Sequence, residues 1–207
     1  MDNHFEPWIK YPPLTSDRLE VIAELIRSVR HEALGLHEPV AGDNEWSLGC
    51  RVYVRTCHAL REAAKERTWL SIVREEENLR FTFAIGSIPF RFYHGEAGAP
   101  PGRYLIATYG EIHQRQMALK LDGMPSIDGV LRLAVETGAT GEVVAVTLVE
   151  MDESHTVTET YAVPLDGDAS RVVPMQAKAV SLPPPEIEVI TPVGEKKAQR
   201  KNKDQRR

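Results

Sequence analysis

Cysteine is scarce in this 207-residue sequence, which has two in all, and no apolar run approaches the roughly 18 to 20 residues that a membrane-spanning helix needs. The first residues, MDNHFEPWIKYPP, lack the basic stretch and apolar core that mark a secretory signal. Secreted domains that depend on disulfides use more cysteine than this. We therefore expect a protein of the reducing cytoplasm that does not associate with membranes.

The common catalytic and cofactor motifs are also missing. The sequence has no P-loop, no Gly-x-Gly-x-x-Gly after a strand and no Gly-x-Ser-x-Gly nucleophile elbow. His31-Glu32 begins like a zinc-protease motif, but Gly35 stands where the second histidine is required. His94-Gly-Glu96 begins like a zinc-deaminase site, but both cysteines precede it. We predict no catalytic residue, no metal site and no cofactor, and we favour a protein that is not an enzyme.

Charge is distributed unevenly along the chain. The last twelve residues, 196–207, carry seven basic side chains and one acid, which is a net charge of +6. Because the whole chain has a net charge of −5, residues 1–195 have a net charge of −11. Three consecutive prolines at 183–185 precede this run. We expect residues 169–207 to form a flexible, Pro-rich and basic tail. Such a tail either improves solubility or tethers nucleic acid or an acidic partner, through Lys196, Lys197, Arg200 and Lys201.

The first half of the sequence has helical periodicity. Residues 1–15, with aromatic side chains among prolines, are predicted to form an extended arm, and residues 16–168 a single α+β domain. A helix is expected from Ser16 or Asp17, because apolar residues then recur every three or four positions up to Gly35. A second helix is expected from Asp43 or Asn44. The Gly/Pro-containing connection favours an antiparallel helix pair.

From residue 69 onward the apolar period becomes two, which is typical of strands. Strands are predicted at 69–74, 79–85, 103–109, 130–137, 142–151 and 156–163, with a further strand after a tight turn at Gly86-Ser87 and a short helix at 111–121. The assignment of 105–130 as strand, helix or loop stays open. The resulting fold is α+β: an N-terminal helix pair packed on a mostly antiparallel sheet of about six strands.

Four of the five phenylalanines lie between residues 81 and 92, on the two arms of the hairpin. The turn at Gly86-Ser87 sets a register that pairs Phe83 with Phe90 and places these rings on one face. They form either a buried core under the helices or an exposed platform that stacks nucleic-acid bases. The second helix has an apolar stripe that suits such a face, so we favour the buried core.

The second helix also carries a basic stripe, with Arg51, Arg55, Arg61 and Lys65 as candidate nucleic-acid contacts. A solvated face with internal ion pairs is the plainer interpretation, since Glu62 lies within the stripe. Cys57 falls in the apolar stripe and is expected to be buried, whereas Cys50 flanks it. An intact helix separates these two cysteines too far for a disulfide.

The loop after the hairpin, HGEAGAPPG, and the residue that follows it bring together His94, Glu96 and Arg103, and Tyr109, Glu111 and His113 come shortly after. A histidine and a carboxylate suit acid–base chemistry, and an arginine suits an anion, so His94, Glu96 and Arg103 are candidates for a small-molecule site. An ordinary surface loop would have the same composition.

Three functions follow from these patterns. The leading hypothesis is a non-enzymatic cytoplasmic interaction or accessory module whose partner is another protein or a second copy of this chain. The second is a nucleic-acid-associated accessory protein that uses the basic tail and the second helix. The third is a small-molecule enzyme or ligand-binding protein with its site at the 94–103 loop.

Overall fold

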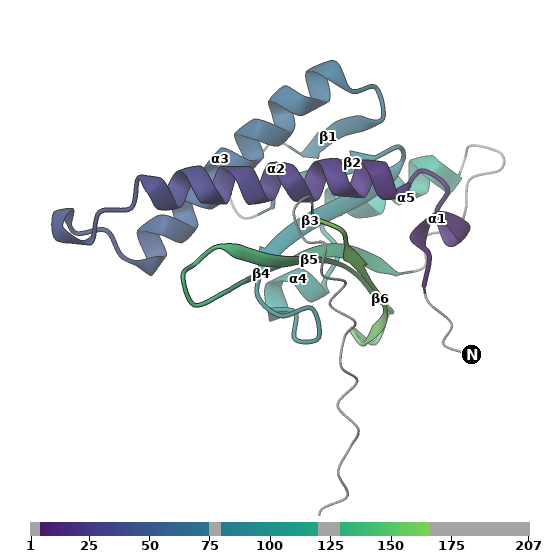
Figure 1. Cartoon of the computed structure of the whole chain (residues 1–207). Helices are drawn as coiled ribbons and strands as arrows, with labels where there is room; N and C mark the ends of the chain where they lie inside the picture. The colour runs from purple at the N-terminus through teal and green to yellow at the C-terminus, as the bar shows by residue number, and fades with distance from the viewer. Residues whose placement is uncertain (1–4, 75–79, 120–128, 166–207) are drawn as a thin grey trace, which may run out of the picture. The chain divides into compact units, whose positions relative to one another are not determined.

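The computed structural model describes residues 5–74, 80–119 and 129–165. It confirms the α+β fold (Figure 1). The helical elements are α1 (Pro7–Lys10), α2 (Ser16–Gly35), the 3-10 turn η1 (Pro39–Ala41), α3 (Glu45–Glu66), α4 (Gly102–Leu105) and α5 (Tyr109–Leu119). The strands are β1 (Leu70–Arg74), β2 (Thr82–Ile85), β3 (Ile88–His94), β4 (Val130–Thr137), β5 (Val143–Met151) and β6 (Val157–Val163). The predicted tail at 169–207 lies outside the described residues, as do its candidate basic residues.

The predicted helix pair is confirmed, with α2 and α3 joined by a short connection that contains η1. The N-terminus of α3 is fixed by its own side chains: Asn44 accepts a hydrogen bond from the Ser47 amide, and Ser47 Oγ accepts one from the Asn44 amide. This capping box satisfies two amides that the helix itself cannot pair. None of the helices in the described part of the chain is long and apolar enough to cross a membrane.

The hairpin of β2 and β3 has the predicted register, with Ile85 opposite Ile88 and Phe83 opposite Phe90. Gly86 takes a φ of +63° at the turn, a conformation that other residues adopt at a cost. The rings of Phe83 and Phe90 are stacked with centroids 5.7 Å apart and are fully buried. The aromatic segment is therefore core, and the base-stacking platform is ruled out.

The segment between β3 and β4 differs from the prediction. Residues 103–109 were expected to form a strand, but they contain the helical turn α4, a short connection and the start of α5. The short helix expected near 111–121 is confirmed as α5. Because this segment crosses over a face of the sheet, β3 and β4 pair in parallel, while all other neighbouring strands pair antiparallel in the order β1 to β6.

The sheet separates two cores. One face carries the phenylalanines and packs against α2 and α3; in Figure 1, α2 runs across the strands and α3 diverges from it toward β1. The other face carries a smaller apolar cluster that includes Tyr93, Ala134 and Val149, packed with Tyr104 of α4. Side chains alternate between the two cores along each strand, since successive residues of a strand point to opposite faces.

The arm before α2 contains one helical turn, α1, within the residues expected to be extended. Tyr11, which follows it, is fully buried, and its hydroxyl donates a 2.7 Å hydrogen bond to the buried carboxylate of Glu150 on β5. Lys10 forms an ion pair with the same carboxylate. These contacts fasten the arm to the sheet.

Candidate anion-binding site

Two arginines lie side by side on the second face of the sheet, where apolar residues would be expected. Arg91 of β3 and Arg132 of β4 are register partners in the parallel pair. Each lies between apolar neighbours that face the helix pair, so the alternation of the strand turns the arginine toward α4 and α5. Both are buried, with 3% and 0% of their surface exposed.

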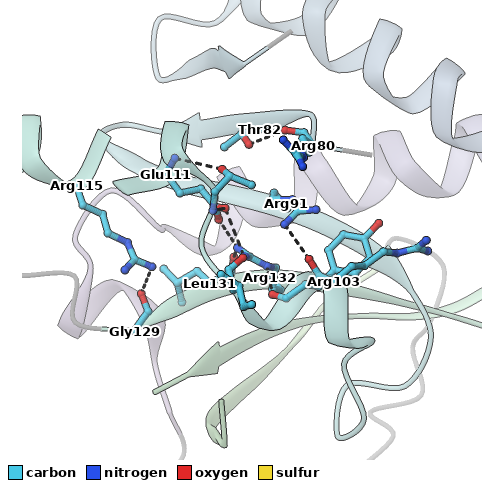
Figure 2. Close-up of polar contacts among 12 residues, drawn as sticks. Arg80, Thr82, Arg91, Arg103, Glu111, Arg115, Gly129, Leu131 and Arg132 are labelled. Atoms are coloured by element: carbon cyan, nitrogen blue, oxygen red, sulfur yellow. Dashed lines mark hydrogen bonds and ion pairs between the residues drawn. The ribbon is translucent and has the colours of Figure 1, made fainter. Parts of the chain in front are cut away.

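Arg132 is held by the crossover segment on several sides (Figure 2). Its guanidinium forms an ion pair with Glu111 of α5. Its Nε donates to the carbonyl oxygen of Tyr104 at 2.8 Å, and Nη2 donates to that of Ile106 at 3.3 Å. These bonds fix the position of α4 and α5 on the sheet. Burial lowers the pKa of Arg132 to about 10. The attraction of Glu111 opposes this shift, and repulsion by Arg91 adds to it. The guanidinium therefore stays charged at neutral pH.

Glu111 is positioned by the N-terminus of its own helix. Its backbone amide donates to Thr108 Oγ1 at 3.3 Å, and its carboxylate accepts a 2.7 Å bond from the Thr108 amide. This is a capping box, in which both side chains satisfy amides at the start of α5. The carboxylate that neutralises Arg132 therefore cannot move without disturbing the helix start.

Beside this ion pair lies a cavity of about 340 Å³. Its lining residues are Arg74, Arg80, Arg91, Arg103, Ile106, Ala107, Thr108 and Tyr109. Four arginine residues thus line one small space, and no carboxylate is among the described residues that line it. Three glutamates at 75–77 follow Arg74 directly in the sequence and lie outside the described residues.

Tyr104 organises two of the four arginines. The guanidinium carbons of Arg91 and Arg103 lie 4.6 and 5.2 Å from the centroid of its ring, within the range of cation–π contacts. Arg91 also donates a hydrogen bond of 3.3 Å to the carbonyl oxygen of Arg103. Because Tyr104 is buried against Tyr93, this arrangement rests on the sheet rather than on a loose loop.

This geometry suits anions. Arginine offers planar pairs of donors that match the oxygens of phosphate and carboxylate. Thr108 and Tyr109 bring the first turn of α5 to the cavity wall, and the positive end of a helix dipole favours negative charge there. Among the described residues that line the cavity, no nucleophile is paired with a base, which is the arrangement that covalent catalysis requires.

Of the three residues predicted at the 94–103 loop, only Arg103 lines the cavity. The imidazole Nε2 of His94 lies 2.9 Å from Thr137 Oγ1. Burial and the positive charge of Arg30, opposed by Glu45, lower the pKa of His94. Glu96 contributes its backbone carbonyl, which accepts a 3.2 Å hydrogen bond from the Tyr93 hydroxyl.

The basic stripe of α3 is dispersed among local contacts. Arg51 binds both carboxylate oxygens of Asp43, at 3.2 and 3.0 Å, which joins α3 to the connection before it. Lys65 pairs with Glu62 on the same helix. Arg61 lies over the ring of Phe81 at 5.3 Å, and Arg55 is half-buried. The four basic side chains of this stripe therefore differ in their local contacts.

The cavity's other three arginines, Arg74, Arg80 and Arg91, were missed as site residues. A signal was present: Arg91 and Arg132 are charged residues at alternating positions of otherwise apolar strands, which marks a second, polar environment on that face. The spacing from Thr108 to Glu111 also has the form of a capping box and would have placed the start of α5.

A second cavity, of about 430 Å³, is lined by three carboxylates of α2, Asp17, Glu20 and Glu24, together with Val21, Arg67 and Pro164. None of these lining residues is fully buried. Within the described ranges, no three His, Cys, Asp or Glu side chains gather closely enough to hold a metal ion. The four-arginine cavity is therefore the candidate functional site. No family model, curated protein or solved structure matches this chain.

Proposed function

We propose that this chain is a non-enzymatic protein of the cytoplasm that binds a small anion, bearing phosphate or carboxylate groups, in the four-arginine cavity. The observation that carries the proposal is that four arginine residues line one cavity. Ligand pockets commonly measure about 300–1,000 Å³, so a cavity of about 340 Å³ suits a small molecule. Two free cysteines are compatible with a reducing compartment.

Burial gives a further argument for a specific ligand. Arg91 is held on the sheet by the rigid surroundings of Tyr104, whereas Arg80 and Arg103 are exposed. An anion would therefore meet one preorganised guanidinium at the floor and mobile side chains at the rim. Preorganised donors bind more tightly because less side-chain freedom is lost on binding.

Thermal unfolding and calorimetric titration of the full chain with phosphate, pyrophosphate and citrate test the proposal. A ligand at 100 times its Kd stabilises the folded state by about 2.7 kcal/mol. We expect R80M and R103M to raise the Kd by about tenfold or more, since a hydrogen bond to a charged group contributes about 1.5–3 kcal/mol.

The matched control is R27M, which removes an arginine from α2 on the opposite face of the sheet. Equal weakening by R27M and R103M would indicate a general charge effect and contradict a specific site. No heat of binding and no thermal shift with any of the three anions would refute the proposal. The same titration on E75Q/E76Q/E77Q measures whether the three glutamates that follow Arg74 in the sequence affect the affinity for the ligand.

A second candidate function, interaction with another protein or with a second copy of this chain, is favoured by one specific feature. Apolar side chains are exposed where α2 and α3 are joined, at the end of the helix pair that extends past the sheet in Figure 1. Trp46 is 77% and Val40 is 99% exposed. Size-exclusion chromatography with light scattering tests self-association: a dimer that W46A/V40S converts to a monomer supports it, and a monomer at all concentrations contradicts it.

A further inference from the structure

Beside the exposed Arg80 and Arg103, the rim of the four-arginine cavity also carries apolar and aromatic side chains. Ile106 and Tyr109 line the cavity and are also 65% and 77% exposed. Ile112, one turn further along α5, is 43% exposed. Large apolar side chains that gather beside a charged cavity indicate a ligand with both an anionic and an apolar part.

Tyr109 presents its ring beside the arginines in a supported position. It is the first residue of α5, where the capping box of Thr108 and Glu111 fixes the backbone. Its ring is stacked on the imidazole of His113, with centroids 6.4 Å apart and an interplanar angle of 28°. A second planar group can therefore lie against the ring of Tyr109 without a large rearrangement of α5.

We infer that the ligand is an organic phosphate with a planar aromatic group, of the mononucleotide class, with its phosphates among the arginines and its base stacked on Tyr109. This inference rests on the proposed anion-binding function and specifies the ligand class. A diphosphate satisfies several guanidinium groups at once, which a single carboxylate cannot do. Stacking on an aromatic side chain tolerates different bases, so the structure selects the class and not the base.

Alternative anions lack one of the two parts. Inorganic phosphate and pyrophosphate have no apolar group to cover Ile106 and Tyr109. A sugar phosphate such as ribose 5-phosphate has no planar ring. A nucleoside diphosphate should therefore bind more tightly than pyrophosphate, and the difference should depend on the ring of Tyr109.

Isothermal titration of the full chain at about 150 mM salt, with pyrophosphate, ribose 5-phosphate, ADP and UDP, tests the inference. We expect ADP or UDP to bind about 5- to 100-fold more tightly than pyrophosphate, the range given by stacking of one base. Y109A should reduce the ratio of nucleotide affinity to pyrophosphate affinity to about one, whereas Y109F should retain the ratio of the wild type. W46A, which removes another exposed aromatic side chain, is the matched control and should change neither affinity.

The outcomes separate this inference from the proposed function. If pyrophosphate and the nucleotides bind equally, or if Y109A does not alter their ratio, the nucleotide assignment is wrong and anion binding stands. Tighter binding of ribose 5-phosphate than of ADP also overturns the assignment. If none of the four ligands binds, both proposals fail.

Discussion

Replacing Glu111 with glutamine tests the buried ion pair that holds the crossover segment on the sheet. The side chains of Arg132 and Glu111 are 0% and 1% exposed, so no solvent is available to replace a lost charge. E111Q keeps the size of the side chain and removes its charge. The guanidinium then remains buried as a cation beside Arg91, its register partner.

The magnitude follows from what Arg132 retains. Breaking a buried pair by removing one partner costs about 3–5 kcal/mol. In E111Q the guanidinium still donates to the carbonyl oxygens of Tyr104, Leu131 and Ile106, so we expect the lower end, about 3 kcal/mol. For a domain of this size that loss lowers Tm by about 6–12 °C. R132M should cost more, about 5 kcal/mol, since it also leaves these carbonyls without their donor.

Urea unfolding followed by tryptophan fluorescence and circular dichroism measures both variants. E153Q is the control, because Glu153 is an exposed carboxylate, and it should stay within about 0.5 kcal/mol of the wild type. A loss below about 1 kcal/mol for E111Q would refute the reasoning. It would mean that the folded state accommodates the buried charge of Arg132 without the negative charge of Glu111.

Three further predictions concern the hairpin and the thiols. F90A should destabilise the fold by about 3–5 kcal/mol in urea, since it empties space under the helix pair. G86A should cost about 1–3 kcal/mol, because the φ of +63° disfavours alanine and an added Cβ would lie 2.7 Å from Pro13 Cβ; G98A, with nothing within 4 Å, is its control, and equal stability of the two would contradict this. Burial raises the pKa of the Cys57 thiol to about 11, so a thiol reagent at about pH 8 should modify only Cys50 until the protein unfolds. Because the folded state holds Cys57 as the neutral thiol, its contribution to stability is present below the unfolded pKa of about 8.5 and declines as pH rises past it. Rapid modification of both thiols in the native protein would contradict the burial of Cys57.

The parts of the fold that the sequence predicted are those set by local pattern. The helix that begins at Ser16, the turn at Gly86 and the meander from Val130 onward depend on periodicity and on turn residues within a few positions. Residues 103–109 are rich in the aromatic and β-branched residues typical of strands, but there tertiary contacts override this preference. Tyr104 is buried against Tyr93, and the backbone carbonyls of this segment bind Arg132, so it folds as a turn and a connection.

The candidate site was only partly predictable because it depends on strand neighbours. Arg103 was identified from its loop, but its position beside Arg91 follows from α4 packing on the sheet. The parallel pairing of β3 with β4 brings Arg91 next to Arg132, and a single sequence does not show which strands are neighbours. Helix periodicity gave the basic stripe of α3, but not the internal partners that its residues bind.

The parallel junction of β3 and β4 has a consequence for the order in which the chain folds. Every other strand pair joins segments that follow each other closely, so those pairs form with little loss of chain entropy. Only this junction must close over residues 95–129, and we expect it to form last. The four-arginine cavity lies there, with Arg91 on β3 and Arg103 in the crossover. An intermediate in which β1–β3 and β4–β6 have paired, but the crossover has not docked, would have native-like secondary structure and no binding site. Recovery of anion binding should therefore mark the end of refolding.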